Sequence, residues 1–306
     1  MKNLLDKLRP PVDTTPKVMP STVIAPQLLE FLGAVREKRW TPGMYHASGL
    51  YNMCPREAQF IEVCQEKGMK FTEQVEAARR VTFDIGHAMN IIVRDYWLKQ
   101  IGGLYGHWRC RACGKTIEGV DLWGAPCPKA KAGCGQGEEG RKNMGRDYME
   151  IELVDNELNI VGSMDGVLVG RGPLPDEDVG LEIKTIYRDG FRRLEEPYPS
   201  HVYQVNIYMH MAKLRSCVIL YVSKEENDPP LKEFLVTHDP KVMKAVRRDL
   251  GELAQAKSEG RWAKGVCPTD KTKRAGTCFF KEVCFGKAAT VLPEDIGLAD
   301  FPSLGD

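Results

Sequence analysis

Residues 161–184 read VGSMDGVLVGRGPLPDEDVGLEIK, two apolar runs rich in β-branched residues that are joined by a link containing Gly and Pro. This pattern predicts a β-hairpin. Glu182 and Lys184 stand two positions apart in the second run, so their side chains project from the same face of the strand. Asp165 begins the first run, and pairing of the two runs brings its carboxylate toward that of Glu182. Buried charges are costly unless they are paired or bind a metal ion, so these carboxylates require a partner.

Oxygen ligands of this kind suit Mg²⁺ or Mn²⁺, with water completing the coordination shell. Such ions promote phosphodiester hydrolysis by neutralising charge on the phosphate and by lowering the pKa of a bound water. Lys184 would lie beside that water as a positive charge. The alternative for this short E-x-K pattern, taken alone, is an ion pair on the solvent face of an edge strand.

Composition limits the class of protein. In 306 residues, 43 basic and 42 acidic side chains nearly cancel, which excludes a globally basic nucleic-acid binder and leaves local basic patches. No apolar run approaches the ~20 residues that span a bilayer, and the polar start MKNLLDKLRPP is not a secretory signal. We therefore expect a soluble cytoplasmic protein without a membrane partner. Ten cysteines in a reducing compartment indicate metal or cluster ligands rather than disulfides.

Helical and strand periodicities around the hairpin predict a mixed α/β layer with a central sheet. The predicted helices cover residues 72–100, with an interruption near Gly86, 199–214 and 240–260. The further predicted strands cover residues 148–154, 217–223 and 231–238.

The chain divides into six predicted segments. They are an N-terminal arm with a short helix (1–45), a helical part of the core (46–106), an inserted four-cysteine module (107–146), the core sheet and helices (147–262), a C-terminal cysteine segment (263–288) and an acidic tail (289–306).

The motifs GSMDG, LEIKT and YQVNIYM together resemble the RecB-like branch of the PD-(D/E)XK nuclease superfamily. That branch has a helical histidine, an aspartate after a glycine-containing turn, an E-x-K strand and a Q-x-x-x-Y helix. The counterparts here, in the same order, are His87, Asp165, Glu182 with Lys184, and Gln204 with Tyr208. The resemblance covers about residues 45–290. It implies a restriction-endonuclease-like α/β core, a central mixed sheet flanked by helices, with the four-cysteine metal module inserted.

The resemblance also implies the metal ligands. Asp165, Glu182 and the main-chain carbonyl of Ile183 would hold one divalent ion, and the neutral imidazole of His87 would offer a nitrogen to a second. Without the other motifs, His87 is better interpreted as a partly buried histidine of a helix.

A nucleic-acid contact surface is implied next to these ligands. Gln204 and Tyr208 are four apart and share a helix face; by the resemblance they face the carboxylates and seat a DNA strand. Without that context they are ordinary packing and surface residues. The segment YRDGFRR supplies basic residues with interleaved aromatic rings, typical of a single-strand groove or of a solvated basic turn. These residues are Arg188, Arg192 and Arg193, with Tyr187 and Phe191.

One set of cysteines lies within the insertion. Cys110, Cys113, Cys127 and Cys134 form C-x2-C-x13-C-x6-C, which predicts a tetrahedral structural Zn²⁺ site. His107 is a possible substitute ligand, and four unligated thiols are the alternative. The module is locally basic, so it can serve as a DNA contact or as a docking surface.

A second set is dispersed along the chain, at Cys54, Cys267, Cys278 and Cys284. Several RecB-like nucleases, including the AddB type and the CRISPR-associated adaptation nucleases, hold a [4Fe–4S] cluster with one cysteine before the core and three after it. The resemblance implies such a cluster here, as a structural staple. The ten-residue gap after Cys267 keeps Zn²⁺ open as a substitute. The two remaining cysteines, Cys64 and Cys217, are interpreted as buried thiols.

These interpretations predict a metal-dependent DNA exonuclease that hydrolyses phosphodiester bonds on single-stranded or other DNA ends, in recombination, repair or replication. No G-x-x-x-x-G-K-[ST] loop occurs, so unwinding would require a partner helicase. The alternatives are a non-catalytic DNA-binding or scaffold subunit of a nuclease–helicase complex, and a structure-specific or sequence-specific endonuclease. By the resemblance, a phage origin fits this compact design, and the host cytoplasm would then be its location. The sequence indicates neither the polarity of digestion nor an oligomeric state.

Overall fold

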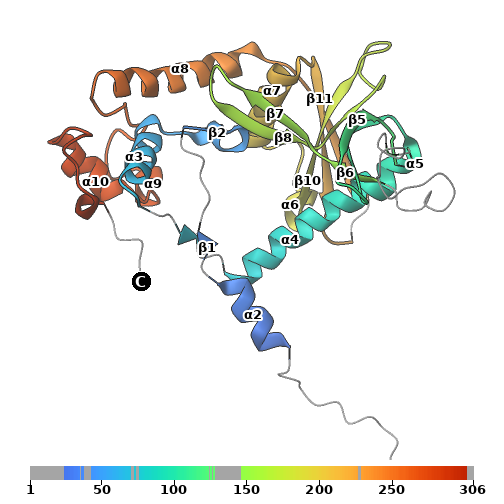
Figure 1. Ribbon diagram of the computed structural model, residues 1–306, viewed down its shortest axis with the longest axis horizontal. Coiled ribbons are helices and arrows are strands. Elements are labelled where there is room, and N and C mark those ends of the chain that lie inside the picture. Colours follow the sequence, from blue (N-terminus) through green and yellow to red (C-terminus); the bar gives the residue numbers. More distant parts are fainter. Residues whose placement is uncertain are drawn as a thin grey trace, which may run out of the picture.

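The computed structural model describes residues 24–34, 36–37, 43–69, 72–73, 76–123, 125, 127, 146–226 and 229–301. Within this part of the chain a central mixed sheet is flanked by helices, which confirms the predicted α/β architecture (Figure 1). None of the described helices combines the length and the apolar composition that a membrane-spanning segment requires.

Within the described residues, the largest sheet has seven strands in the order β12-β11-β10-β9-β4-β5, with β6 paired to β4. Strand β10 runs parallel to β11, whereas the other pairs of this sheet are antiparallel. The strands are β4 (Leu104–Cys110), β5 (Thr116–Val120), β6 (Arg146–Met149), β9 (Gly166–Leu168), β10 (Val179–Ile186), β11 (Ser216–Ser223) and β12 (Leu231–Thr237).

A smaller sheet of β2 (Tyr45–His46), β8 (Ile160–Met164) and β7 (Ile151–Asp155) adjoins the large one. The chain passes between the two sheets through single residues. Glu150 separates β6 from β7, and Asp165 separates β8 from β9. A separate two-stranded pair joins β1 (Arg36–Glu37) to β3 (Thr72–Glu73).

The long helix α4 (Ala77–Ile92) runs without a break through Gly86, so the predicted interruption there is wrong. A glycine is needed at this place because a Cβ atom would lie 3.0 Å from Oγ1 of Thr185 on β10. The helix changes instead at η2 (Val93–Leu98), a π-helical turn, and continues briefly as α5 (Lys99–Ile101). This turn packs Val93 and Leu98 into the core on one face of the large sheet.

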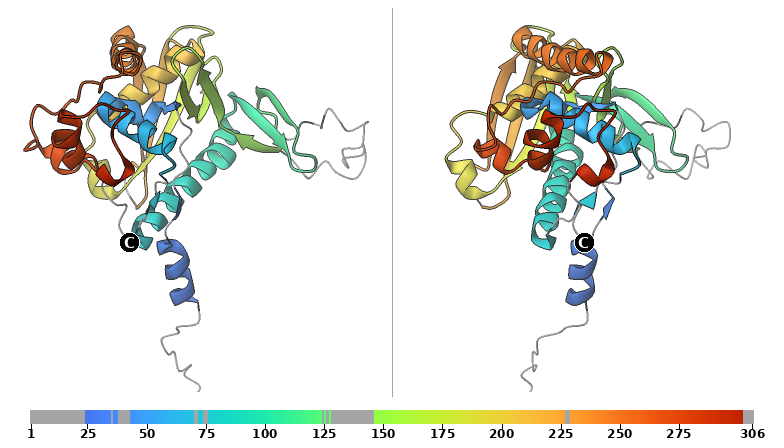
Figure 2. Two further views of the ribbon diagram at one scale, coloured as in Figure 1. Left: turned by 60° about the vertical axis from the view of Figure 1, so that its left-hand side comes forward. Right: turned by 90° about the vertical axis from the view of Figure 1, so that its left-hand side faces the viewer.

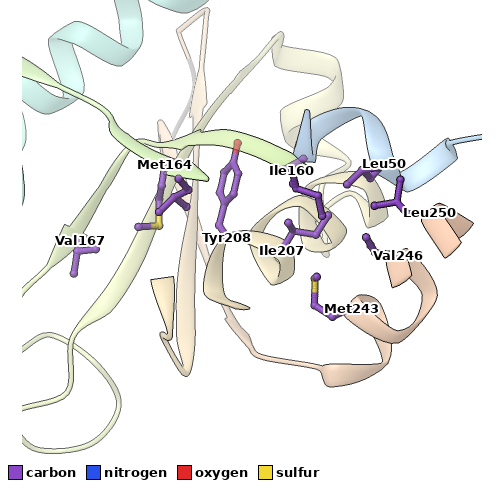
Figure 3. Close-up of a cluster of buried hydrophobic side chains, with 11 residues drawn as sticks. Leu50, Ile160, Met164, Val167, Ile207, Tyr208, Met243, Val246 and Leu250 are labelled. Carbon is purple, nitrogen blue, oxygen red and sulfur yellow. The ribbon is translucent and has the colours of Figure 1, made fainter. Parts of the chain in front are cut away.

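The opposite face is covered by α7 (Pro199–Ala212), which with α6 (Arg188–Arg192) forms the crossover between parallel strands β10 and β11. Helix α8 (Pro240–Ser258) packs in turn on α7. Figure 3 shows the core between them, in which Met243 and Val246 of α8 lie near Ile207 of α7.

The predicted four-cysteine insertion, residues 107–146, takes part in the large sheet. Its strand β5 and most of β4 belong to the ladder, so the predicted boundary at 106/107 falls inside β4. Trp108 is fully buried there, with its ring 5.1 Å from that of Tyr148. A Cβ atom at Gly106 would overlap the Tyr148 ring, and such a required glycine helps to hide the strand periodicity.

The two ends of the described chain meet beside this core. Helix α3 (Pro55–Glu66) lies against α9 (Lys273–Gly276) and α10 (Lys281–Phe285) (Figures 1 and 2). The predicted acidic tail, residues 289–306, packs into this cluster through the buried side chains of Ile296 and Phe301 rather than extending from it. The remaining short helices are α2 (Ala25–Gly33), η1 (Ala47–Asn52), η4 (Lys287–Ala289) and η5 (Leu298–Asp300).

Candidate functional site

The site is centred on Asp165, the residue at which the chain leaves β8 for β9. The predicted hairpin is confirmed, since Gly166 of β9 pairs with Leu181 of β10. Asp165 is 6% exposed, and its two carboxylate oxygens have different partners. Oδ2 accepts the main-chain N–H of Ile183 at 2.7 Å, and Oδ1 accepts Nη1 of Arg94 at 3.2 Å.

Glu182 and Lys184 lie on one face of β10, as the strand period predicts. Oε1 of Glu182 accepts Nζ of Lys184 at 2.6 Å and Nε2 of Gln204 at 3.1 Å. The Glu182 side chain is 5% exposed, and β10 lies between β9 and β11. The alternative of a solvent-facing ion pair on an edge strand is therefore excluded.

The Q-x-x-x-Y motif of α7 completes this network. Gln204 accepts Nζ of Lys184 on Oε1 at 3.1 Å, and its Nε2 donates to Oη of Tyr208 at 2.8 Å. The Tyr208 ring packs against the backbone of Gly162, where a Cβ atom would overlap it. Both motif residues are buried and, as sequence spacing predicts, share the helix face toward the carboxylates.

Three residues of the site were not found from the sequence. Arg94 of η2 donates through Nη1 to Oε1 of Glu150 at 2.8 Å as well as to Asp165. Tyr148 donates its hydroxyl to the main-chain oxygen of Asp165 at 2.8 Å. These three come from segments without a motif, and the available signal is weak: Arg94 follows His87 by seven positions, two turns along one helix face.

The electrostatics of the two carboxyl groups reflect their burial. Desolvation raises the pKa of Asp165 to about 8, and the charge of Glu182 adds to the rise, while the Ile183 N–H and Arg94 oppose it. Burial also raises the pKa of Glu182, against the lowering influence of Lys184. Two buried carboxyl groups that favour protonation in this way would be stabilised as carboxylates by a further cation.

The donor set fits a divalent cation. Oε2 of Glu182 is buried and, within the described part of the chain, has no hydrogen-bond partner. A buried carboxylate oxygen without a donor is rare in proteins, and a metal ion would satisfy it. The Ile183 N–H points to Asp165, and in an extended residue the carbonyl leaves the strand on the same side. The ladder with β9 ends at Leu181, so β9 does not take that carbonyl.

His87 stands apart from this group. It is exposed on α4. Among the described residues, no ligand set within 4.8 Å joins its imidazole to Asp165 and Glu182. The structure therefore does not bring this predicted ligand to the carboxylates, and its role remains a prediction.

The basic segment after β10 is partly exposed. Arg192 and Arg193 are exposed, whereas Arg188 donates from Nε to the main-chain oxygen of Glu226 at 3.0 Å. The interpretation of Phe191 as a stacking residue is wrong, since it is 1% exposed and packs in the core under α7.

Tyr187 remains accessible beside this segment. It is 46% exposed, and its hydroxyl lies 3.0 Å from Oγ1 of Thr82 on α4. This contact joins the start of the basic segment to the long helix.

Three cysteines of the insertion converge. Cys110, Cys113 and Cys127 place their sulfur atoms within 4.8 Å of one another, which suits a metal ion. Gly114 has φ +70°, and its N–H donates to the Cys110 carbonyl at 2.8 Å, forming the tight turn that this group requires. The fourth predicted ligand, Cys134, lies outside the described residues.

The possible substitute ligand of this metal site does not join it. Nε2 of His107 lies 3.4 Å from a carboxylate oxygen of Glu118, within the β4–β5 pair.

The dispersed cysteines also meet. Cys54, Cys267, Cys278 and Cys284 all line one small cavity between α3 and the C-terminal segment. Burial raises the pKa of the Cys278 and Cys284 thiols, and neighbouring cysteines of the set contribute to the rise. Nη1 of Arg56 lies 3.7 Å from the Cys284 sulfur.

The two remaining cysteines behave differently. Cys64 and Cys217 are both fully buried, which confirms their interpretation as core thiols. Cys64 packs beside Phe60, and Cys217 packs under α7.

No protein-family model and no curated protein matches the sequence. Three solved structures show weak similarity. The alkaline exonuclease LHK-Exo from Laribacter hongkongensis is 13% identical, with a TM-score of 0.43 over 71% of this chain and 90% of that chain. Its complex with dAMP gives a TM-score of 0.37 at the same identity and coverage. The protein SSO0001 is 14% identical, with a TM-score of 0.36 over 85% of this chain and 93% of that chain.

Proposed function

We propose that this chain is a Mg²⁺- or Mn²⁺-dependent deoxyribonuclease of the PD-(D/E)XK type, which hydrolyses phosphodiester bonds from single-stranded DNA ends. One observation carries the proposal. Glu182, buried beside Asp165 and 2.6 Å from Lys184, keeps one oxygen without a donor among the described residues. A purely structural ion pair would have its buried oxygens satisfied.

In this proposal Asp165, Glu182 and the Ile183 carbonyl hold the divalent ion. When bound, the ion supplies positive charge to the phosphate oxygens and makes water a stronger nucleophile. Lys184 presents its ammonium group to the attacking oxygen and to the charge that develops in the transition state. Gln204 fixes the position of this group, since it bonds both Glu182 and Lys184.

DNA contacts are proposed beside the carboxylates. Arg192 and Arg193, which are exposed, would contact phosphates together with Arg188, and Tyr187 offers an accessible ring for base stacking. Tyr208 would act through Gln204, whose amide it holds at 2.8 Å. His87 is proposed as a ligand that would have to approach from α4.

The test is degradation of end-labelled single-stranded DNA with Mn²⁺ by the unchanged protein and by Asp165→Ala. Asp295→Ala, at an exposed aspartate of the C-terminal segment, is the matched control. Progressive release of mononucleotides that only Asp165→Ala abolishes supports the proposal. Discrete fragments would identify an endonuclease, and intact DNA with every protein would indicate a non-catalytic subunit.

We also propose the two cysteine sites as structural cofactors. The shared cavity of Cys54, Cys267, Cys278 and Cys284 supports a [4Fe–4S] cluster, with Zn²⁺ as the alternative, and the converging insertion cysteines support Zn²⁺. Protein purified without oxygen should be brown, with about four irons and about one zinc per chain. A colourless preparation with about two zinc ions would assign zinc to both sites. A helicase partner would supply any unwinding.

A further inference from the structure

Arg94 connects the two junctions at which the chain crosses between the sheets. Its guanidinium is 6% exposed, and Nη1 bonds Glu150 at 2.8 Å and Asp165 at 3.2 Å. The guanidinium carbon lies 5.5 Å from the centre of the Tyr148 ring. This arginine is therefore enclosed between two carboxylates and an aromatic face.

The register explains why a cation is needed there. Ile151 pairs with Met164, so Glu150 and Asp165 are the next opposed positions, at the border of the two sheets. Like charges that face each other across paired strands are destabilising. Glu150 also contributes to the raised pKa of both Asp165 and Glu182, so all three carboxyl groups share one field.

Asp165 presents one oxygen to each side of this field. Oδ2 faces Ile183 and the Glu182 side, where the orphaned Oε2 lies. Oδ1 faces Glu150 and is occupied by Arg94. A divalent ion bridging Oδ1 and Glu150 would lie within a few ångströms of the guanidinium, where like charges repel strongly. Arg94 and an ion at that position thus exclude each other.

We propose that Arg94 acts as a fixed counter-ion that limits the site to one divalent cation, because it holds the Asp165–Glu150 side against a second. The inference rests on the proposed metal site and deepens it. Arg94 is a positioning residue in this scheme: it keeps Asp165 directed toward Glu182 without contacting the reacting atoms. If the arginine were only a structural partner of Glu150, its removal would leave the number of bound ions unchanged.

The experiment counts Mn²⁺ bound by the full chain, by equilibrium titration with electron paramagnetic resonance of free Mn²⁺. Counts are taken relative to an Asp165→Asn/Glu182→Gln double variant, which corrects for binding elsewhere. We expect one ion for the unchanged protein and two for Arg94→Gln. In the Arg94→Gln/Glu150→Gln double variant the count should return to one, since the second ion loses a ligand.

The matched control is Arg248→Gln, which removes an exposed arginine paired with Asp249 and should leave the count at one. If Arg94→Gln folds only with added Mn²⁺, it is purified in Mn²⁺ and counted in the same way. A variant that fails to fold even then overturns the inference, because the second ion should replace the lost charge. One ion in Arg94→Gln, or two in the unchanged protein, also overturns it and leaves the proposed function standing. No ion in the unchanged protein would overturn both.

Discussion

Replacing Lys184 by Met tests whether the buried charges of β10 serve catalysis or stability. Methionine keeps much of the side-chain length but removes the ammonium group that lies 2.6 Å from Glu182. Removing one partner of a buried ion pair costs about 3–5 kcal/mol. Lys184 is 22% exposed and Gln204 still donates to Glu182, so we expect the lower end, about 3 kcal/mol at pH 8. In a chain of this size that lowers the melting temperature by about 6 °C or more.

The pH dependence of this loss has a definite sign. Burial already raises the pKa of Glu182 in the folded protein, and Lys184 is the main influence that lowers it. Without Lys184 the folded-state pKa rises further above its unfolded value. A group with a raised pKa loses its contribution to stability as the pH rises through that pKa. The melting temperature of Lys184→Met should therefore fall further below that of the unchanged protein at pH 8 than at pH 5.

The assay combines thermal unfolding at both pH values with degradation of labelled single-stranded DNA in Mn²⁺. The activity of Lys184→Met should fall by at least about a hundredfold. The control is Lys184→Met in a Glu182→Gln background, where the lysine has no carboxylate to pair and its removal should cost little stability. An equal loss of melting temperature at both pH values, or unchanged DNA degradation, would refute the reasoning.

Three further predictions concern the ion, the motif helix and the cluster. Mn²⁺ affinity should weaken about tenfold per pH unit below pH 8, measured by titration, because burial raises the pKa of Asp165 to about 8 and protons compete with the ion. Gly162→Ala, whose methyl would overlap the Tyr208 ring, should lower the free energy of unfolding by about 1–3 kcal/mol and reduce DNA degradation; an unchanged melting temperature would contradict this packing. Cys284→Ser should lose iron and lower the melting temperature, whereas Cys217→Ser should keep the iron; equal iron in both variants would exclude Cys284 as a ligand.

The acidic hairpin could be predicted from the sequence because its information is local. Period-2 alternation places Glu182 and Lys184 on one face, and the helical period does the same for Gln204 and Tyr208. The structure shows both pairs in one hydrogen-bonded network. The meeting of Cys54 with the C-terminal cysteines is a long-range contact that only the resemblance suggested.

The other half of the site could not be predicted because its contacts are distant in sequence. Arg94 reaches Glu150 and Asp165 from a π-helical turn, 56 and 71 positions away. Local periodicity does not reveal such a turn. Phe191 shows the reverse error: a ring among arginines suggested stacking, although the crossover from β10 to β11 buries it.

The border between the two sheets explains why the carboxylates gather where they do. Asp165 interrupts a strand that continues on both sides, with Met164 in one core and Leu168 in the other. A residue at such a break has side-chain room that a ladder position lacks, while well-packed strands hold it in place. Glu150 occupies the equivalent break between β6 and β7. Two breaks at one border bring two carboxylates together, which a fold selected for stability alone would avoid. Arg94 on one side and Lys184 on the other make this arrangement tolerable without a metal ion and leave Oε2 of Glu182 for one.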